Sequence, residues 1–251
     1  MNIVENNINF INSNKNQINT KIYYVKFDNM TDLQSTIDNE FVDIVHADST
    51  YDLEPTKKEI YKILCKKNDQ QQHGAIAEFF AHIVIRKIGF TQQCLYKNLE
   101  ESSMKKGFDG LYSYNNIFWI MESKSAKEEN IHKNKIDEAI KSIRTAIEDL
   151  SRNNPWLNAV HHISNLENNQ RNDSIKQKVK KLSKDFQEGV KHTINEFNLI
   201  PVSTLFLPSS QNLAEIISDI NTLLTNTNYR QIIIVCIDNY IFNDFIEYLR
   251  N

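Results

Sequence analysis

Glycine and proline are scarce in this chain of 251 residues, which has five glycines and four prolines. Neither a GxxxxGK(S/T) phosphate loop nor a GxGxxG dinucleotide turn occurs. We therefore do not expect the chain itself to bind ATP or a dinucleotide by these routes. The scarcity also leaves no Gly-rich or Pro-rich linker to mark a domain boundary.

Cysteine is equally rare, with three widely spaced residues at Cys65, Cys94 and Cys236. An odd number at this spacing argues against a disulfide framework and against a CxxC-type zinc site. We expect all three to be buried free thiols.

Long apolar runs are also absent. The longest is Ile232–Ile237, which has the length of a strand and is far too short to cross a membrane. The N-terminal residues contain neither a basic nor an apolar region, so they do not resemble a secretory signal. We expect a cytoplasmic protein without a membrane partner.

Positive charge is not in excess overall, because the formal net charge is −3. Its distribution is uneven: residues 56–194 have 24 lysines and arginines against 17 aspartates and glutamates, whereas both ends of the chain are acidic. A positive central segment favours a substrate with a phosphate backbone. The alternative is an ordinary fluctuation of charge along the chain.

Hydrophobic periodicity predicts an α/β protein with a mixed sheet. We expect strands at 20–27, 90–97, 108–114, 117–124, 199–207 and 230–238, with residues 1–19 a loose arm or an edge strand. We expect helices at 30–47, 55–67, 73–88, 129–150, 172–196 and 240–250, and irregular structure at 151–170. We predict that 1–70 elaborate a main domain of 71–251, or that 1–251 form one unit.

The helix predicted at 73–88 is apolar on every face, which is typical of a buried helix. Glu78 lies in its middle, and a buried carboxylate needs a cation, a hydrogen-bond network or a metal. A salt bridge with His82 or Arg86 is one interpretation. A role at a metal site is the other.

Residues 107–124 carry the most information about function. Gly107-Phe108-Asp109-Gly110 precedes a short hairpin, and the second strand ends in Glu122-Ser123-Lys124. An acidic-x-Lys tripeptide is common by chance, so its position at the end of an apolar strand is the signal. Two carboxylates and a lysine delivered to one edge of a sheet can hold Mg²⁺ or Mn²⁺ and activate a water molecule.

Each residue has a predicted role at this site. Asp109 and Glu122 would be the metal ligands, the backbone carbonyl of Ser123 a third oxygen, and Glu78 a ligand to a second cation or one acting through water. Lys124 would orient or activate the water or stabilise charge on phosphorus. The alternatives are a surface ion pair for Glu122 and Lys124 and a simple turn for Asp109.

Glu78, Asp109 and the Glu122-Ser123-Lys124 string, in the order helix–strand–strand–strand–helix–strand, resemble the PD-(D/E)XK nuclease superfamily. Phe108 stands where the superfamily's name implies proline. More narrowly, an N-terminal extension, the stretch 106–110 and the C-terminal strand–helix pairs resemble the HamA family of the Hachiman anti-phage defence system. The resemblance implies a restriction-endonuclease-like fold, Mg²⁺-dependent DNA cleavage and a helicase partner of the HamB type.

A lysine stripe on the helix predicted at 172–196 is a weaker candidate for DNA binding. It contains Lys176, Lys180, Lys184 and Lys191, and a solvated helix face is the alternative. Two other functions stay open: a catalytically silent DNA-binding or scaffold subunit, and an α/β protein with a structural cation. A homo-oligomer is also consistent with the sequence, since two active sites would cut two strands most simply.

Overall fold

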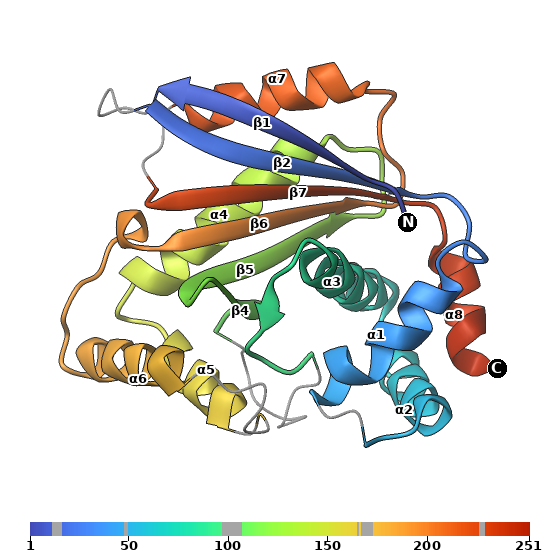
Figure 1. The fold of residues 1–251 in the computed structure, drawn as a ribbon, viewed down its shortest axis with the longest axis horizontal. Coiled ribbons are helices and arrows are strands. Elements are labelled where there is room, and N and C mark those ends of the chain that lie inside the picture. Colours follow the sequence, from blue (N-terminus) through green and yellow to red (C-terminus); the bar gives the residue numbers. More distant parts are fainter. Residues whose placement is uncertain (12–16, 48–49, 97–106, 165, 167–172, 226–228) are drawn as a thin grey trace.

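The computed structural model describes residues 1–11, 17–47, 50–96, 107–164, 166, 173–225 and 229–251. These residues form one seven-stranded sheet in the order β1-β2-β7-β6-β5-β4-β3, with helices on both faces (Figure 1). The predicted class, a mixed sheet flanked by helices in an α/β fold, is therefore confirmed.

The four central strands β2, β7, β6 and β5 run parallel to one another, whereas β1 at one edge and β4 and β3 at the other are joined by antiparallel pairing. The strands are β1 Ile3–Ile11, β2 Gln17–Phe27, β3 Thr91–Gln92, β4 Gly110–Tyr114, β5 Ile117–Ala126, β6 Asn198–Leu205 and β7 Gln231–Asn239. Of the two possibilities for the N-terminal segment, the structure has the edge strand.

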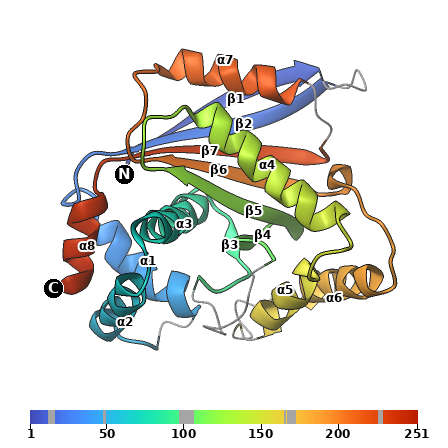
Figure 2. The ribbon, with the colours of Figure 1, turned by 180° about the vertical axis from the view of Figure 1, so that it is seen from behind.

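The helices are divided between the faces of the sheet. One face is covered by α3 Asp69–Lys87, with α1 Gln34–His46, α2 Leu53–Cys65 and α8 Phe242–Arg250 outside it. The view from behind shows α4 His132–Glu148 crossing the other face beside α7 Leu213–Leu224, with α5 Pro155–Ser164 and α6 Asp173–Gln187 below (Figure 2). Along β5 the side chains alternate between two cores, because Trp119 and Met121 belong to the α3 core and Phe118 and Ile120 to the α4 core.

Helix α3 is buried as predicted but begins four residues earlier. Asn68 caps it by accepting a hydrogen bond from the backbone of Gln71, whose side chain accepts one from the backbone of Asn68. This reciprocal capping box satisfies two amide groups that a helix start leaves without partners. It fixes the end of the helix that carries Glu78.

Three predicted elements differ from the structure. Residues 155–164, expected to be irregular, form α5, because Pro155 fits the first turn of a helix and Asn154 accepts from the backbone of Trp156. Of the strand expected at 90–97, residues 90–96 contain only Thr91–Gln92, and residue 97 lies outside the described residues. The helix expected to reach residue 196 ends at Gln187, because Gly189 adopts a φ of 75° and ends the helix.

The N-terminal hairpin belongs to the same sheet as the rest of the chain, because β2 pairs with β7 from Lys21↔Ile233 to Phe27↔Asn239. Among the residues described, no helix is both long and apolar enough to span a membrane. None of the three cysteines forms a disulfide, and Cys94 and Cys236 are buried. Cys65 is exposed, so the expectation that all three are buried is wrong for Cys65.

Candidate functional site

The two strands of the β4–β5 hairpin bring Asp109 beside the Glu122-Ser123-Lys124 string. Gly110 at the start of β4 pairs with Met121, and β5 continues beyond that point. Asp109 therefore lies next to the extended part of β5, where its Oδ2 accepts a 2.9 Å hydrogen bond from the backbone amide of Ser123. Glu122 and Lys124, two residues apart, share the face of the sheet that packs against α4.

Glu122 and Lys124 form an ion pair, with Lys124 Nζ 2.8 Å from Glu122 Oε1. The Glu122 side chain is 11% exposed and that of Lys124 is 30% exposed. Burial raises the pKa of Glu122 above its ordinary value, against the opposing charge of Lys124. Burial also opposes the charge of Lys124, but Glu122 and, more weakly, Asp109 outweigh it, so the pKa of the lysine is raised and it stays protonated.

Glu78 approaches from α3, on the other face of the sheet. Its side chain is 13% exposed, and its Oε1 lies 3.9 Å from His82 Nε2. Arg86, the other proposed partner, instead bridges Glu40 and Asp43. The negative charge of Glu78 contributes to the raised pKa of Glu122, so the two carboxylates are within electrostatic reach.

A pocket of about 670 Å³ opens over the ion pair. Asp109, Glu122 and Lys124 line its sheet side. The opposite wall comes from α4 and from the loop that leads into α5, through Ser142, Ala146, Ser151, Arg152, Asn153, Asn154 and Pro155. Glu78 is not among the residues that line this pocket.

Gly107 joins the two walls. A Cβ atom at this position would lie 2.2 Å from the carbonyl oxygen of Pro155, a separation that no side chain tolerates. The backbone that leads to Asp109 is therefore in close contact with the start of α5, and only glycine permits it.

The oxygen atoms of this site fit a hard divalent cation better than zinc or a soft metal. Among the residues described, no group of three or more His, Cys, Asp or Glu side chains is arranged to hold a metal. Two carboxylates and a backbone carbonyl nevertheless suit Mg²⁺, which keeps several waters and takes substrate phosphate oxygens as further ligands.

The remaining sequence candidates lie apart from this cluster. Lys176 is half-buried on α6, and Lys180 and Lys184 are exposed on the same helix. Lys191 is exposed beyond the end of that helix. The loop at 151–154 also lines the pocket and was not predicted from the sequence, although the Asn-Pro pair at Asn154 and Pro155 is a helix-start signal that marks its end.

A comparison with known protein families identifies the family of the chain. The sequence model of the HamA family matches residues 1–241 of this chain. The match includes the N-terminal hairpin, both walls of the pocket and every residue proposed for the site. No curated protein matches the chain.

Proposed function

The chain belongs to the HamA family and is a subunit of a Hachiman defence system, and on this premise we propose that it is a metal-dependent DNA nuclease. The observation that carries the proposal is the pocket in which Asp109, Glu122 and Lys124 meet. A buried acid–lysine pair open to solvent on one side is suited to phosphodiester hydrolysis.

Asp109 and Glu122 would hold Mg²⁺ or Mn²⁺, together with the backbone carbonyl of Ser123, while Glu78 would act through water. When bound, the cation supplies a Lewis acid for the scissile phosphate and lowers the pKa of a water molecule. Ser123 fixes Asp109 by its backbone hydrogen bond, so the orientation of this carboxylate is set by β5.

Lys124 would orient the attacking water and stabilise the negative charge that gathers on phosphorus. Its raised pKa keeps it positively charged at neutral pH. A protonated lysine suits charge stabilisation and water positioning, and it makes Lys124 a poor general base.

We also propose that a helicase subunit of the HamB type controls this activity. The sequence contains neither a GxxxxGK(S/T) phosphate loop nor a GxGxxG dinucleotide turn, so energy from ATP would have to come from a partner. Restraint by a partner would also suit a defence nuclease, which has to spare the host DNA until an infection begins.

The test is incubation of the purified chain with supercoiled plasmid in Mg²⁺, Mn²⁺ or EDTA, alone and with its helicase partner. We expect nicking that requires the metal and is lost in Lys124→Ala. Lys127→Ala is the matched control, because Lys127 lies just beyond β5 and pairs with Asp69, outside the pocket lining. Circular dichroism and thermal melting would establish that both variants are folded.

Three results would contradict the proposal. Binding of DNA without cleavage in any metal, even with the helicase, would indicate a catalytically silent subunit. Equal cleavage by Lys124→Ala and Lys127→Ala would remove Lys124 from the chemistry. A melting temperature that falls on chelation, with no effect of DNA, would indicate a structural cation.

A further inference from the structure

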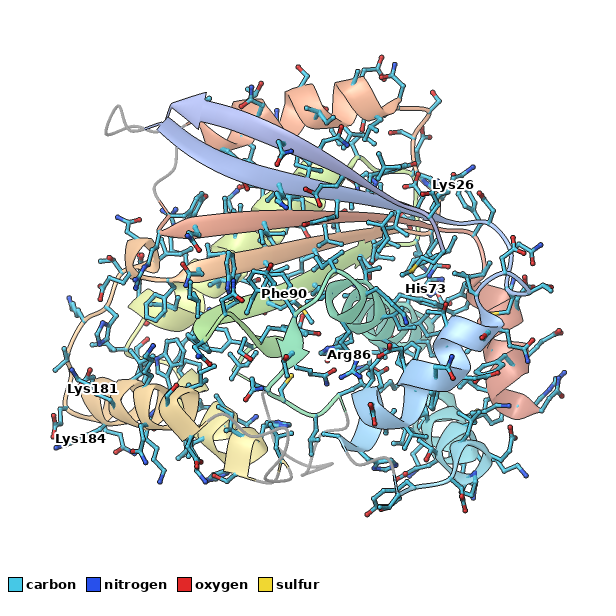
Figure 3. All side chains as sticks on the ribbon, in the orientation of Figure 1. Lys26, His73, Arg86, Phe90, Lys181 and Lys184 are labelled. Carbon is cyan, nitrogen blue, oxygen red and sulfur yellow. The ribbon has the colours of Figure 1, made fainter. Side chains whose placement is uncertain are left out.

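Helix α6 exposes an array of lysines that its neighbours do not neutralise. Among the residues described, Lys176, Lys178, Lys180 and Lys181 have no acidic partner, and Lys184 has only Glu188, at 3.5 Å. Two of the lysines of α4 differ, because Lys135 and Lys141 pair with Glu138 and Asp137 on their own helix. Lys181 and Lys184 lie on the outer side of α6, away from the sheet (Figure 3).

The same helix is joined to the wall of the pocket. Asn154, which lines the pocket, donates from its Nδ2 to the backbone oxygen of Ser183 at 2.9 Å and to the Ser183 hydroxyl at 3.1 Å. Lys180 is three residues before Ser183 and is therefore its neighbour on the helix surface, and Lys184 is in turn a neighbour of Lys180, four residues on. Lys180 and Lys184 therefore lie near the point where the pocket wall is attached to α6.

Arg152 belongs to the same pocket-lining loop as Asn154. It lines the pocket, and its side chain is 52% exposed. Its Nε donates to Asp149 at 3.2 Å, and this is the one acidic contact of its guanidinium group among the residues described. The outer nitrogens are therefore available, and a guanidinium group binds a phosphate through two parallel hydrogen bonds.

We propose that Arg152 and the lysines at 176, 180 and 184 form a track for the backbone of DNA, which leads from the pocket across the 151–154 loop onto α6. The inference rests on the proposed function, because it assigns the pocket a phosphodiester substrate. The inference adds the path that the DNA strand takes beyond the reacting phosphate. It also predicts that the contacts along this path are made to the phosphates and carry no sequence specificity.

The composition of the exposed side of α6 favours DNA over a protein partner. Between residues 173 and 187 no large hydrophobic side chain is exposed. Protein interfaces depend on buried aromatic and aliphatic anchors, whereas phosphate contacts need little more than charge and hydrogen-bond donors. A row of lysines without such anchors is suited to binding a polyanion.

The track can be tested by binding alone, in EDTA, so that no cleavage takes place. Fluorescence anisotropy would follow a dye-labelled DNA duplex across a range of salt concentrations. We compare the wild-type chain with Lys176→Gln/Lys180→Gln/Lys184→Gln and with Arg152→Gln. A matched triple control is Lys58→Gln/Lys62→Gln/Lys66→Gln, which removes the same charge at the same spacing.

The control lysines lie on or next to α2, at the other end of the molecule from α6 (Figure 1). They are exposed and have no acidic partner among the residues described. Loss of three phosphate contacts should reduce the steepness of log K against log salt by about 2 to 3 and weaken binding about tenfold or more near physiological salt. Arg152→Gln should reduce the slope by about 1.

Equal effects of the two triple variants, or no effect of the α6 triple variant, would overturn the track. Preferential displacement of the duplex by an RNA of equal length would overturn DNA as its ligand. The measurement is independent of catalysis. If DNA binding depends on the α6 lysines but the chain never cuts plasmid, the proposed nuclease activity is refuted and the track stands. If the chain cuts plasmid but binding does not depend on these lysines, the track is refuted and the nuclease activity stands.

Discussion

Replacing Lys124 with methionine is expected to destabilise the protein, because the change removes the partner of a buried carboxylate. The two groups are 2.8 Å apart, and only 11% of the Glu122 side chain is exposed. Breaking a fully buried ion pair costs about 3–5 kcal/mol. Because Lys124 is 30% exposed beside an open pocket, water replaces part of its interaction, and we expect about 2 kcal/mol.

The loss of stability caused by Lys124→Met should grow with pH. Burial raises the pKa of Glu122 in the folded protein, so the stability that this group contributes is complete below its unfolded pKa and is lost as pH rises through the folded pKa. Lys124 is the main influence that lowers this pKa. Without it the pKa of Glu122 in the folded protein rises further, so the decline in stability continues to higher pH. Lys124→Met should therefore be less destabilising at pH 5 than at pH 8.

Urea unfolding followed by circular dichroism, in EDTA at both pH values, would measure the free energy of unfolding. A loss of about 2 kcal/mol at pH 8 corresponds to a fall of about 4–8 °C in the melting temperature. Glu122→Gln/Lys124→Met should be more stable than Lys124→Met alone, because the double variant buries no charge. A double variant no more stable than the single one, or an equal loss at both pH values, would refute the reasoning.

Two further changes test the pocket wall and the end of α6. Gly107→Ala should cost about 1–3 kcal/mol in urea unfolding, because its Cβ would collide with the backbone of Pro155, whereas Gly74→Ala, with open space around it in α3, should stabilise by up to about 1 kcal/mol. Burial lowers the pKa of His192, but Glu196 and Asp185 outweigh this effect and the pKa is raised. The stabilisation that His192 provides over His192→Gln should thus be complete at pH 6 and decline by pH 9, and a difference that does not change with pH would contradict the assignment.

The central strands and the sheet-side residues of the site could be predicted from sequence, because their signals are local. Apolar runs marked β5, β6 and β7. The change from the apolar Met121 to the charged Glu122 marked the point where the side chains of β5 begin to line the pocket. The hairpin around Asn115 and Asn116 has positive φ at both residues, as Asn permits. Such features depend on neighbours in the chain and leave a pattern.

The second wall of the pocket could not be predicted, because it depends on contacts between distant segments. Gly107 meets Pro155, and Asn154 bonds Ser183, across separations that periodicity does not encode. Pro155 begins α5 inside the segment 151–170 that was predicted to be irregular, and Gly189 follows the end of α6 inside the helix that was predicted to reach residue 196. Both errors concern residues whose meaning depends on their position within a helix.

The position of β7 has a consequence for biosynthesis. β2 and β6 lie on either side of this strand, and β7 is the last in sequence order of the seven strands among the residues described. Lys21 pairs with Ile233, which at a translation rate of about 5–20 residues per second is made about 10–40 s later. Until then the N-terminal hairpin has no parallel neighbour and β6 has an open edge. The sheet beneath the pocket is thus completed only after residues 231–239 have been made, and chains truncated before them lack its central strand.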